Sequence, residues 1–156
     1  KSLAMAGTWA KFDRVLQDQV EGLRSAFTHG GFLLFQLLAA SFSFAPEYYN
    51  EKRDQIIGPQ GAWSDLNGRE KAFSRIVESC LSHDTTGRLH EIRCPTFVVH
   101  GGRDVFTAPR FTRFLEKSIP DAIGYDWPDL AHIPSGGDEK KRFDRVLAEF
   151  LASVPK

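Results

Sequence analysis

The stretch Cys94-Pro-Thr-Phe-Val-Val-His-Gly-Gly-Arg-Asp104 has the pattern of a buried strand that runs directly into a tight turn. Residues 96–100 are a short apolar run with β-branched and aromatic side chains, which is typical of a central parallel strand covered on both faces. Gly101 and Gly102 let the backbone turn sharply at the carboxyl end of that strand. Open α/β sheets bind their ligands at this edge, so the carboxylate of Asp104 is a candidate functional group.

A second turn of this kind follows one helix and one strand later. The run Asp129-Leu-Ala-His-Ile-Pro-Ser-Gly-Gly137 places His132 after a strand expected at residues 123–127. We expect the side chains of Asp104 and His132 to lie within hydrogen-bond distance at one end of the sheet. Taken alone, Asp104 would favour a bond to its own backbone, and a lone His132 would be an exposed loop residue.

The order of these features resembles the C-terminal part of an α/β-hydrolase. The resemblance rests on the acid turn, the helix after it, Ile119-Pro-Asp-Ala122, a short strand, Ala131-His-Ile-Pro134 and a closing amphipathic helix. In that family the catalytic triad follows the chain order nucleophile, acid, histidine. The resemblance implies that Asp104 is the acid and His132 the base. It also implies an α/β fold of about three parallel strands with flanking helices and an inserted helical cap.

One part of the family pattern is not in this sequence. The nucleophile elbow, a strand followed by Gly-x-Ser-x-Gly, does not occur, and Ser135 comes after the histidine, in the wrong order. The oxyanion-hole donors would also come from the N-terminal half of such an enzyme. Two hypotheses stay open. The chain is the C-terminal portion of a serine hydrolase or esterase for a small apolar ester, lactone or carbon–carbon bond, or it is a non-catalytic truncated module for dimerisation or partner binding.

The sequence predicts three segments: a first core strand at residues 1–10, a helical cap at residues 11–88, and a C-terminal α/β core at residues 89–156. Four consecutive helices without a strand are typical of a cap inserted into an α/β core. The helices expected in the cap span residues 11–29, 31–45, 46–57 and 69–83. The run at residues 31–45 is rich in phenylalanine and leucine, apolar on most sides, and therefore expected to be a largely buried helix.

A cap of this kind lines an apolar substrate pocket in the family, so the resemblance implies substrate contacts from Trp9, Phe35 and Phe106. The alternative for Trp9 is a core aromatic, and the aromatic residues of the cap can equally be its own core. His100 is interpreted as strand-end packing.

Composition narrows the class of protein and its partners. With 20 basic and 20 acidic residues the net charge is zero, which argues against nucleic acid and anionic membranes as partners. The Phe-rich run is too short and interrupted to span a bilayer. Cys80 and Cys94 favour reduced thiols in a cytoplasmic protein, and no metal site or cofactor is predicted.

The first strand carries an expectation about assembly. The sequence opens at Lys1 in mid-strand, which suggests a truncated or split protein, and residues 2–10 contain none of the features that protect a sheet edge. We therefore expect a homodimer or another homo-oligomer, or pairing with a complementary N-terminal half that would allow a small-molecule substrate to be bound and turned over.

Overall fold

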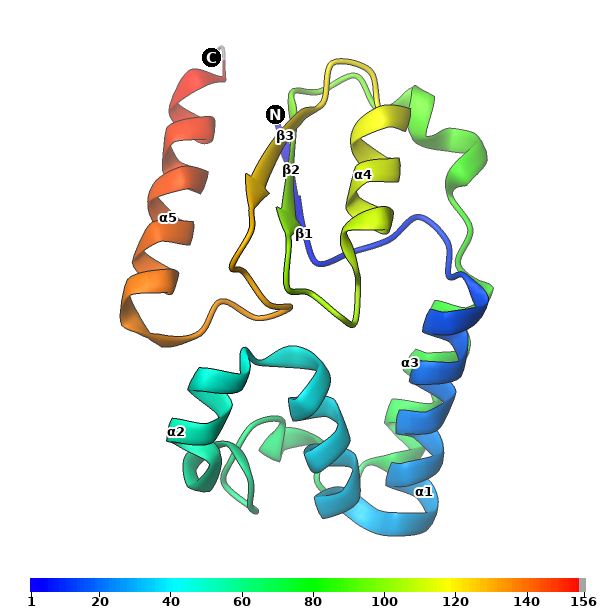
Figure 1. Cartoon of the computed structure of the whole chain (residues 1–156). Helices are drawn as coiled ribbons and strands as arrows, with labels where there is room; N and C mark the ends of the chain where they lie inside the picture. The colour runs from blue at the N-terminus through cyan, green and yellow to red at the C-terminus, as the bar shows by residue number, and fades with distance from the viewer. Residues whose placement is uncertain (155–156) are drawn as a thin grey trace. The chain divides into compact units, whose positions relative to one another are not determined.

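The computed structural model describes residues 1–154, and the chain divides into two compact units. Unit 1 contains residues 1–10 and the chain from residue 85 onward, and unit 2 is Lys11–Asp84. Figure 1 shows helices and strands together in the first unit and helices alone in the second. Residues 85–88, which the sequence analysis assigns to the cap, lie with the strands of unit 1.

Unit 1 is built on a parallel sheet of three strands in the order β1-β2-β3 (Figure 1). The strands are β1 (Leu3–Ala6), β2 (Thr96–Gly101) and β3 (Ile123–Trp127). In the register, Met5 lies opposite Val98, and Val99 lies opposite Tyr125. The three parallel strands predicted from the sequence are confirmed.

The central strand β2 is covered on both faces by helices that follow it in the chain. The helices are α4 (Pro109–Ser118) and α5 (Gly136–Ser153), and Figure 1 shows them on opposite sides of the sheet. Val98 packs with Leu115 of α4, whereas Phe97 stacks on Phe150 of α5 at 5.1 Å between ring centroids. Neighbouring strand residues point to opposite faces, so burial of both faces explains the unbroken apolar run at residues 96–99.

The first strand is shorter than predicted. The apolar run predicts a strand at residues 2–10, but β1 spans only Leu3–Ala6. Gly7 has a φ of 53°, in the left-handed region that favours glycine, and this conformation takes the backbone out of the strand. The rest of the apolar run, up to Ala10, is buried or half-buried outside the sheet.

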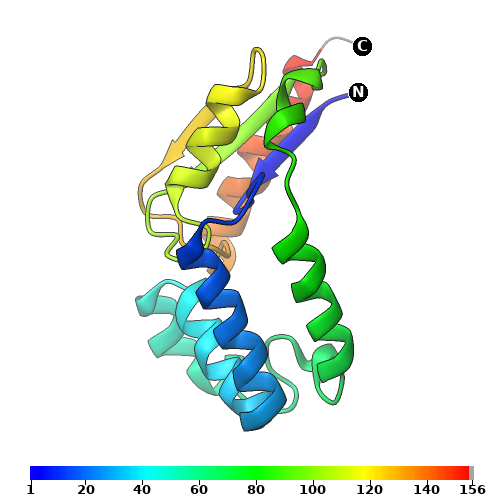
Figure 2. The same cartoon turned by 90° about the vertical axis from the view of Figure 1, so that its right-hand side faces the viewer.

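Unit 2 consists of helices α1 (Arg14–Ser43), α2 (Pro46–Ile56) and α3 (Glu70–Ser82), with a short 3-10 helix η1 at Ser64–Leu66 (Figure 2). A second 3-10 helix, η2 (Thr86–Glu91), lies in unit 1. Asp13 caps α1 by accepting a hydrogen bond from the backbone N of Leu16 at 2.9 Å. Gly31, with φ 79° and ψ 179°, interrupts α1, so the helix end predicted near this glycine is present as a sharp kink.

The prediction of a largely buried helix at residues 31–45 is only half right. The chain after the kink is helical to Ser43, but Leu33 and Leu34 are 57% and 43% exposed. Only the side that carries Phe35 and Gln36 is buried, because a helix offers one stripe of its surface to a neighbour. Leucines around the rest of the helix therefore do not indicate burial.

The interior of unit 2 is an aromatic cluster centred on Phe35. Its ring stacks on Phe27 at 4.9 Å and meets Phe73 of α3 edge-on at 5.0 Å, and the ring of Trp63 lies 6.0 Å away. These contacts join both halves of α1 to α3 and to the segment before η1. Aromatic pairs in such geometries stabilise a core beyond their buried area, by about 0.5–1.5 kcal/mol each.

A buried glutamine fixes the segment between α2 and η1. Gln36 has no exposed surface, and its Nε2 donates to the carbonyls of Ile56, Gly58 and Ala62 at 3.2, 2.9 and 2.8 Å. Its Oε1 accepts from the backbone N of Gly58 at 2.8 Å. One side chain therefore supplies four hydrogen bonds to the backbone of this half-buried segment.

Helix α1 is long and apolar enough, by length and composition alone, to cross a membrane. A core helix of a globular protein passes the same test, so this is weak evidence. The kink at Gly31 and the packing of one side of α1 on the aromatic cluster are features of a core helix.

Candidate functional site: an aspartate–histidine pair at the carboxyl end of the sheet

The acid turn is held by backbone hydrogen bonds to the turn that precedes the histidine. Gly102 N donates to Trp127 O at 2.9 Å, and Arg103 N donates to Leu130 O at 3.0 Å. A Cβ at Gly102 would collide with the backbone of Pro128, so glycine alone fits this close approach. The two turns at the ends of β2 and β3 are thereby fixed against each other.

The structure brings Asp104 and His132 together, as predicted. His132 Nδ1 lies 3.0 Å from Asp104 Oδ2, and the carboxylate side chain is 4% exposed against 20% for the imidazole. Because a carboxylate is only an acceptor, this contact requires a hydrogen on Nδ1. The neutral imidazole then keeps its lone pair on Nε2, where it can accept a proton.

Both oxygens of Asp104 are engaged. Oδ1 accepts from the backbone N of Phe106 at 2.9 Å and of Thr107 at 2.8 Å, while Oδ2 accepts from Thr107 Oγ1 at 2.7 Å. Burial by itself would raise the pKa of Asp104, but the hydrogen bonds from His132 and Thr107 and the charge of His132 hold the pKa of that carboxyl below its usual range. The carboxylate is therefore ionised and fixed in place.

One residue of this site, Thr107, was not predicted from the sequence. Thr107 Oγ1 lies 3.0 Å from His132 Nδ1 as well as against Asp104. A Cβ on Gly7 would lie 3.0 Å from that same Nδ1, so the end of β1 passes directly beside the ring. The spacing of Thr107, three residues after an aspartate on a turn, is a signal that could have identified it.

The three candidate substrate-binding residues lie in different surroundings. Phe106 meets the ring of His132 edge-on, at 5.2 Å between centroids and 81° between planes. Trp9 is half-buried and follows β1 in unit 1. Phe35 is 3% exposed inside the aromatic cluster of unit 2. Substrate contact by these residues stays a prediction.

His100 forms a second histidine cluster, on the α4 side of β2. Its Nδ1 lies 2.8 Å from Thr112 Oγ1, and its Nε2 lies 3.0 Å from Glu116 Oε2. Gly124 of β3 makes room for this pair, because a Cβ there would collide with the Glu116 carboxylate. The packing role expected for His100 is confirmed, with the addition that both ring nitrogens have polar partners.

The charge of His100 is disfavoured in the fold, which predicts a pH effect on stability. Burial lowers the pKa of His100, the nearby charge of Arg113 also lowers it, and the carboxylates of Glu116 and Asp126 oppose both to a smaller extent. The unfolded chain therefore binds a proton at His100 more readily than the folded chain. The stability from this group is complete above the ordinary histidine pKa of about 6.5 and is lost as the pH falls through the lowered folded value.

We expect His100→Gln to lose less unfolding free energy than the wild type between pH 7.5 and pH 5, measured by urea denaturation at each pH. Glutamine can still donate to Glu116 and accept from Thr112 but does not titrate. The exposed His90→Gln serves as the matched control and should follow the wild type. Equal losses in His100→Gln and the wild type would contradict this assignment.

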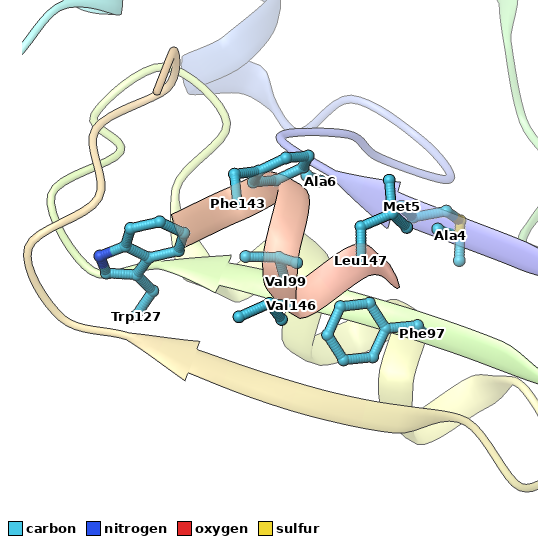
Figure 3. Close-up of a pocket in the computed structure, with 9 residues that line it drawn as sticks. All are labelled: Ala4, Met5, Ala6, Phe97, Val99, Trp127, Phe143, Val146 and Leu147. Carbon is cyan, nitrogen blue, oxygen red and sulfur yellow. The ribbon is translucent and has the colours of Figure 1, made fainter. Parts of the chain in front are cut away.

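An apolar cavity of about 170 Å³ lies in unit 1 between the sheet and α5 (Figure 3). Its walls come from β1, β2, the end of β3 and α5. The lining residues are Ala4, Met5, Ala6, Phe97, Val99, Trp127, Phe143, Val146 and Leu147. The cavity therefore adjoins β1, the strand whose outer edge has no partner among the described residues. Within residues 1–154 no group of three or more histidine, cysteine, aspartate or glutamate side chains could hold a metal ion.

Comparisons with known proteins identify relatives of this fold. No protein-family model matches the chain. A curated relative, the pimeloyl-(acyl-carrier protein) methyl ester esterase of Chromobacterium violaceum, is 28% identical over an alignment of 164 residues, which covers 97% of this chain and 60% of the relative.

Solved structures give the same fold. An alpha/beta hydrolase enzyme from a Medee basin deep-sea metagenome library superposes with a TM-score of 0.78 at 20% identity, over 100% of this chain and 57% of that one. The enol-lactonase of Burkholderia xenovorans LB400 superposes with a TM-score of 0.75 at 17% identity, over 98% and 56% of the two chains. This chain thus spans little more than half the length of the proteins that it matches.

Proposed function

Since this chain has a partial α/β-hydrolase fold, we propose that it is the C-terminal portion of a serine-type carboxylic ester hydrolase. In this proposal Asp104 is the acid and His132 the base of the triad, and the serine nucleophile and oxyanion hole belong to an N-terminal half. The observation that carries the proposal is the contact of His132 Nδ1 with the buried carboxylate of Asp104 at 3.0 Å.

The chemistry follows from this pair. With Nδ1–H held by the carboxylate, Nε2 of His132 accepts the proton of the serine hydroxyl while Oγ attacks the ester carbonyl carbon. The imidazolium then returns the proton to the departing alkoxide, which leaves an acyl-enzyme. Water hydrolyses that intermediate by the same route, with His132 again as the base.

The substrate class is proposed from the relatives. The curated relative is named for a methyl ester, and one solved structure for an enol-lactone, so both names describe esters of carboxylic acids. The aromatic residue beside the imidazole, Phe106, supports an apolar group next to the reacting ester. We therefore propose a small apolar ester or lactone as the substrate.

The test is hydrolysis of p-nitrophenyl butyrate by this chain alone and by the chain co-expressed with an α/β-hydrolase N-terminal half that carries Gly-x-Ser-x-Gly. We expect turnover only with that half, and a loss of about 10³-fold or more with His132→Ala. The exposed His90→Ala, the matched control, should keep the full rate. Turnover that survives His132→Ala would overturn the proposal.

One observation favours a second candidate, a non-catalytic module for dimerisation or partner binding. Among residues 1–154, strand β1 pairs with β2 and with no other strand, and the apolar cavity opens beside Ala4 and Ala6 of β1. An unpaired edge beside apolar surface is a template for another chain. This candidate predicts a homo-oligomer at micromolar concentration by sedimentation, without any gain of esterase activity on adding an N-terminal half. Ala4→Lys, at an exposed position of β1, should dissociate that oligomer. A folded monomer would exclude it.

A further inference from the structure

Thr107 contacts both members of the aspartate–histidine pair through the same side-chain atom. Its Oγ1 lies 2.7 Å from Asp104 Oδ2 and 3.0 Å from His132 Nδ1. Its backbone N donates to the other carboxylate oxygen, Oδ1, at 2.8 Å. Thr107 is 1% exposed, so water does not compete with its hydroxyl for these two partners. Thr107 therefore donates one hydrogen bond to each oxygen of the Asp104 carboxylate.

The protons of this group can be placed from the chemistry of the partners. Oδ2 of Asp104 is only an acceptor, so the hydrogen of the Thr107 hydroxyl is directed to it. The oxygen of that hydroxyl then offers a lone pair to His132 Nδ1, which lies 3.0 Å from both oxygens. An imidazole nitrogen that faces two acceptors must carry the hydrogen, so both contacts favour the same tautomer.

The backbone of Gly7 closes the remaining side of this group. A Cβ built on Gly7 would lie 3.0 Å from His132 Nδ1 and 3.4 Å from Thr107 Oγ1. A side chain at position 7 would therefore push against the ring, and glycine lets the backbone pass beside it. Misplacement of the ring is restricted from that side as well.

We propose that Thr107 is a positioning residue that fixes the Nδ1–H tautomer of His132 by acting as its second acceptor. It orients the carboxylate of Asp104 through two donors and shares the Nδ1 hydrogen through its hydroxyl oxygen. The catalytic consequence rests on the proposed function, whereas the tautomer itself is a property of this chain alone.

The test is two-dimensional proton–nitrogen NMR of the His132 ring in the chain as it exists, at a pH where the imidazole is neutral. In the wild type we expect the nitrogen shift of a protonated Nδ1 and an unprotonated Nε2. Thr107→Val keeps the shape without the hydroxyl, so the carboxylate loses the donor that orients Oδ2 toward Nδ1. We expect both shifts to move part of the way toward each other, because Asp104 is then the remaining acceptor at Nδ1 and the second tautomer gains population. Thr107→Ser restores the hydroxyl and should return the wild-type shifts.

Two further variants keep the result decisive. Thr28→Val makes the same substitution at an exposed threonine of α1 and should leave the His132 shifts unchanged. If Thr107→Val does not fold, Thr107→Ala removes the hydroxyl with less crowding and is read by the same shifts. Wild-type shifts in a folded Thr107→Val or Thr107→Ala variant would overturn the proposal.

The chain co-expressed with an N-terminal half, here called the complemented enzyme, provides a separate measurement. There we expect Thr107→Val to lower kcat by about 10- to 100-fold with little change in KM, by analogy with the hydrogen-bond partners that orient metal-bound histidines. Loss of kcat with rescue by Thr107→Ser supports the inference. An inactive complemented wild type would count against the proposed function, while the NMR shifts would still decide the role of Thr107.

Discussion

Asp104→Asn is expected to lower the esterase rate of the complemented enzyme by about 10⁴-fold while the chain stays folded. Four donors surround this carboxylate: the backbone N of Phe106 and of Thr107, the Thr107 hydroxyl, and Nδ1 of His132. An asparagine offers one NH2 group where only acceptors fit. If that group faces His132, Nδ1 must become the acceptor and Nε2 the donor, and the base is lost.

The measurement compares kcat of the two proteins, with nitrogen NMR of the His132 ring as an independent check on the tautomer. Asp129→Asn is the matched control, because Asp129 is an exposed carboxylate on the turn just before the histidine. It should retain the wild-type rate. A rate for Asp104→Asn within tenfold of the wild type would show that the carboxylate does not act through the imidazole.

Gln36→Leu is expected to destabilise unit 2 by about 2–4 kcal/mol, because it leaves two part-buried backbone groups without the partners that Gln36 provides. The carbonyls of Ile56 and Gly58 would keep their backbone donors, Ala62 N and Gly61 N, at 2.8 and 3.0 Å. The amide of Gly58 and the carbonyl of Ala62 would lose the bonds that Gln36 provides.

Hydrogen exchange at the amide of Gly58 reads this effect directly, and urea denaturation gives the change in free energy of unfolding. We expect the exchange rate of the Gly58 amide to rise by at least the factor that corresponds to the loss in free energy of unfolding. Gln55→Leu, on the exposed side of α2, is the control and should leave both quantities unchanged. Wild-type protection of Gly58 in Gln36→Leu would mean that the glutamine does not hold this segment.

The elements with a strong local signal could be predicted from the sequence. The β-branched and aromatic run before Gly101 predicts strand β2, and its first five residues are all buried in the structure. Helix α4 begins at Pro109, as the proline indicates. The end of an element could not be predicted where a single backbone angle decides it. At Gly7 a left-handed φ ends β1 inside an apolar run that continues to Ala10, and nothing in the letters distinguishes that glycine from one inside a strand.

The exposed side of α1 shows the limit of hydrophobicity as a guide. Leu33 and Leu34 are as apolar as Phe35 in the sequence, yet of these three residues only Phe35 points into the aromatic cluster. A run that is apolar on every side has no periodicity to tell its buried face from its exposed one. That choice is made by the helices that pack against it, which are distant in sequence.

At the candidate site, the order of the acid and histidine turns was sufficient to place Asp104 beside His132. Thr107 was not found because its role depends on an atom that reaches two partners, one three residues away and one 25 residues away. A pattern search that treats each residue type separately assigns such a threonine to the turn. Its second contact becomes visible only when the chain is folded.

The chain leaves unit 1 for unit 2, and returns, through adjacent residues. Thr85 N donates to Ala10 O at 3.0 Å on one side of the crossing, and Lys11 and Asp84 join in an antiparallel bridge with an ion pair of 2.8 Å on the other. An insertion whose two ends touch imposes almost no constraint on its host, whatever its length. Natural or engineered recombination can therefore exchange the whole segment 11–84 for another helical module without altering the turns that carry Asp104 and His132.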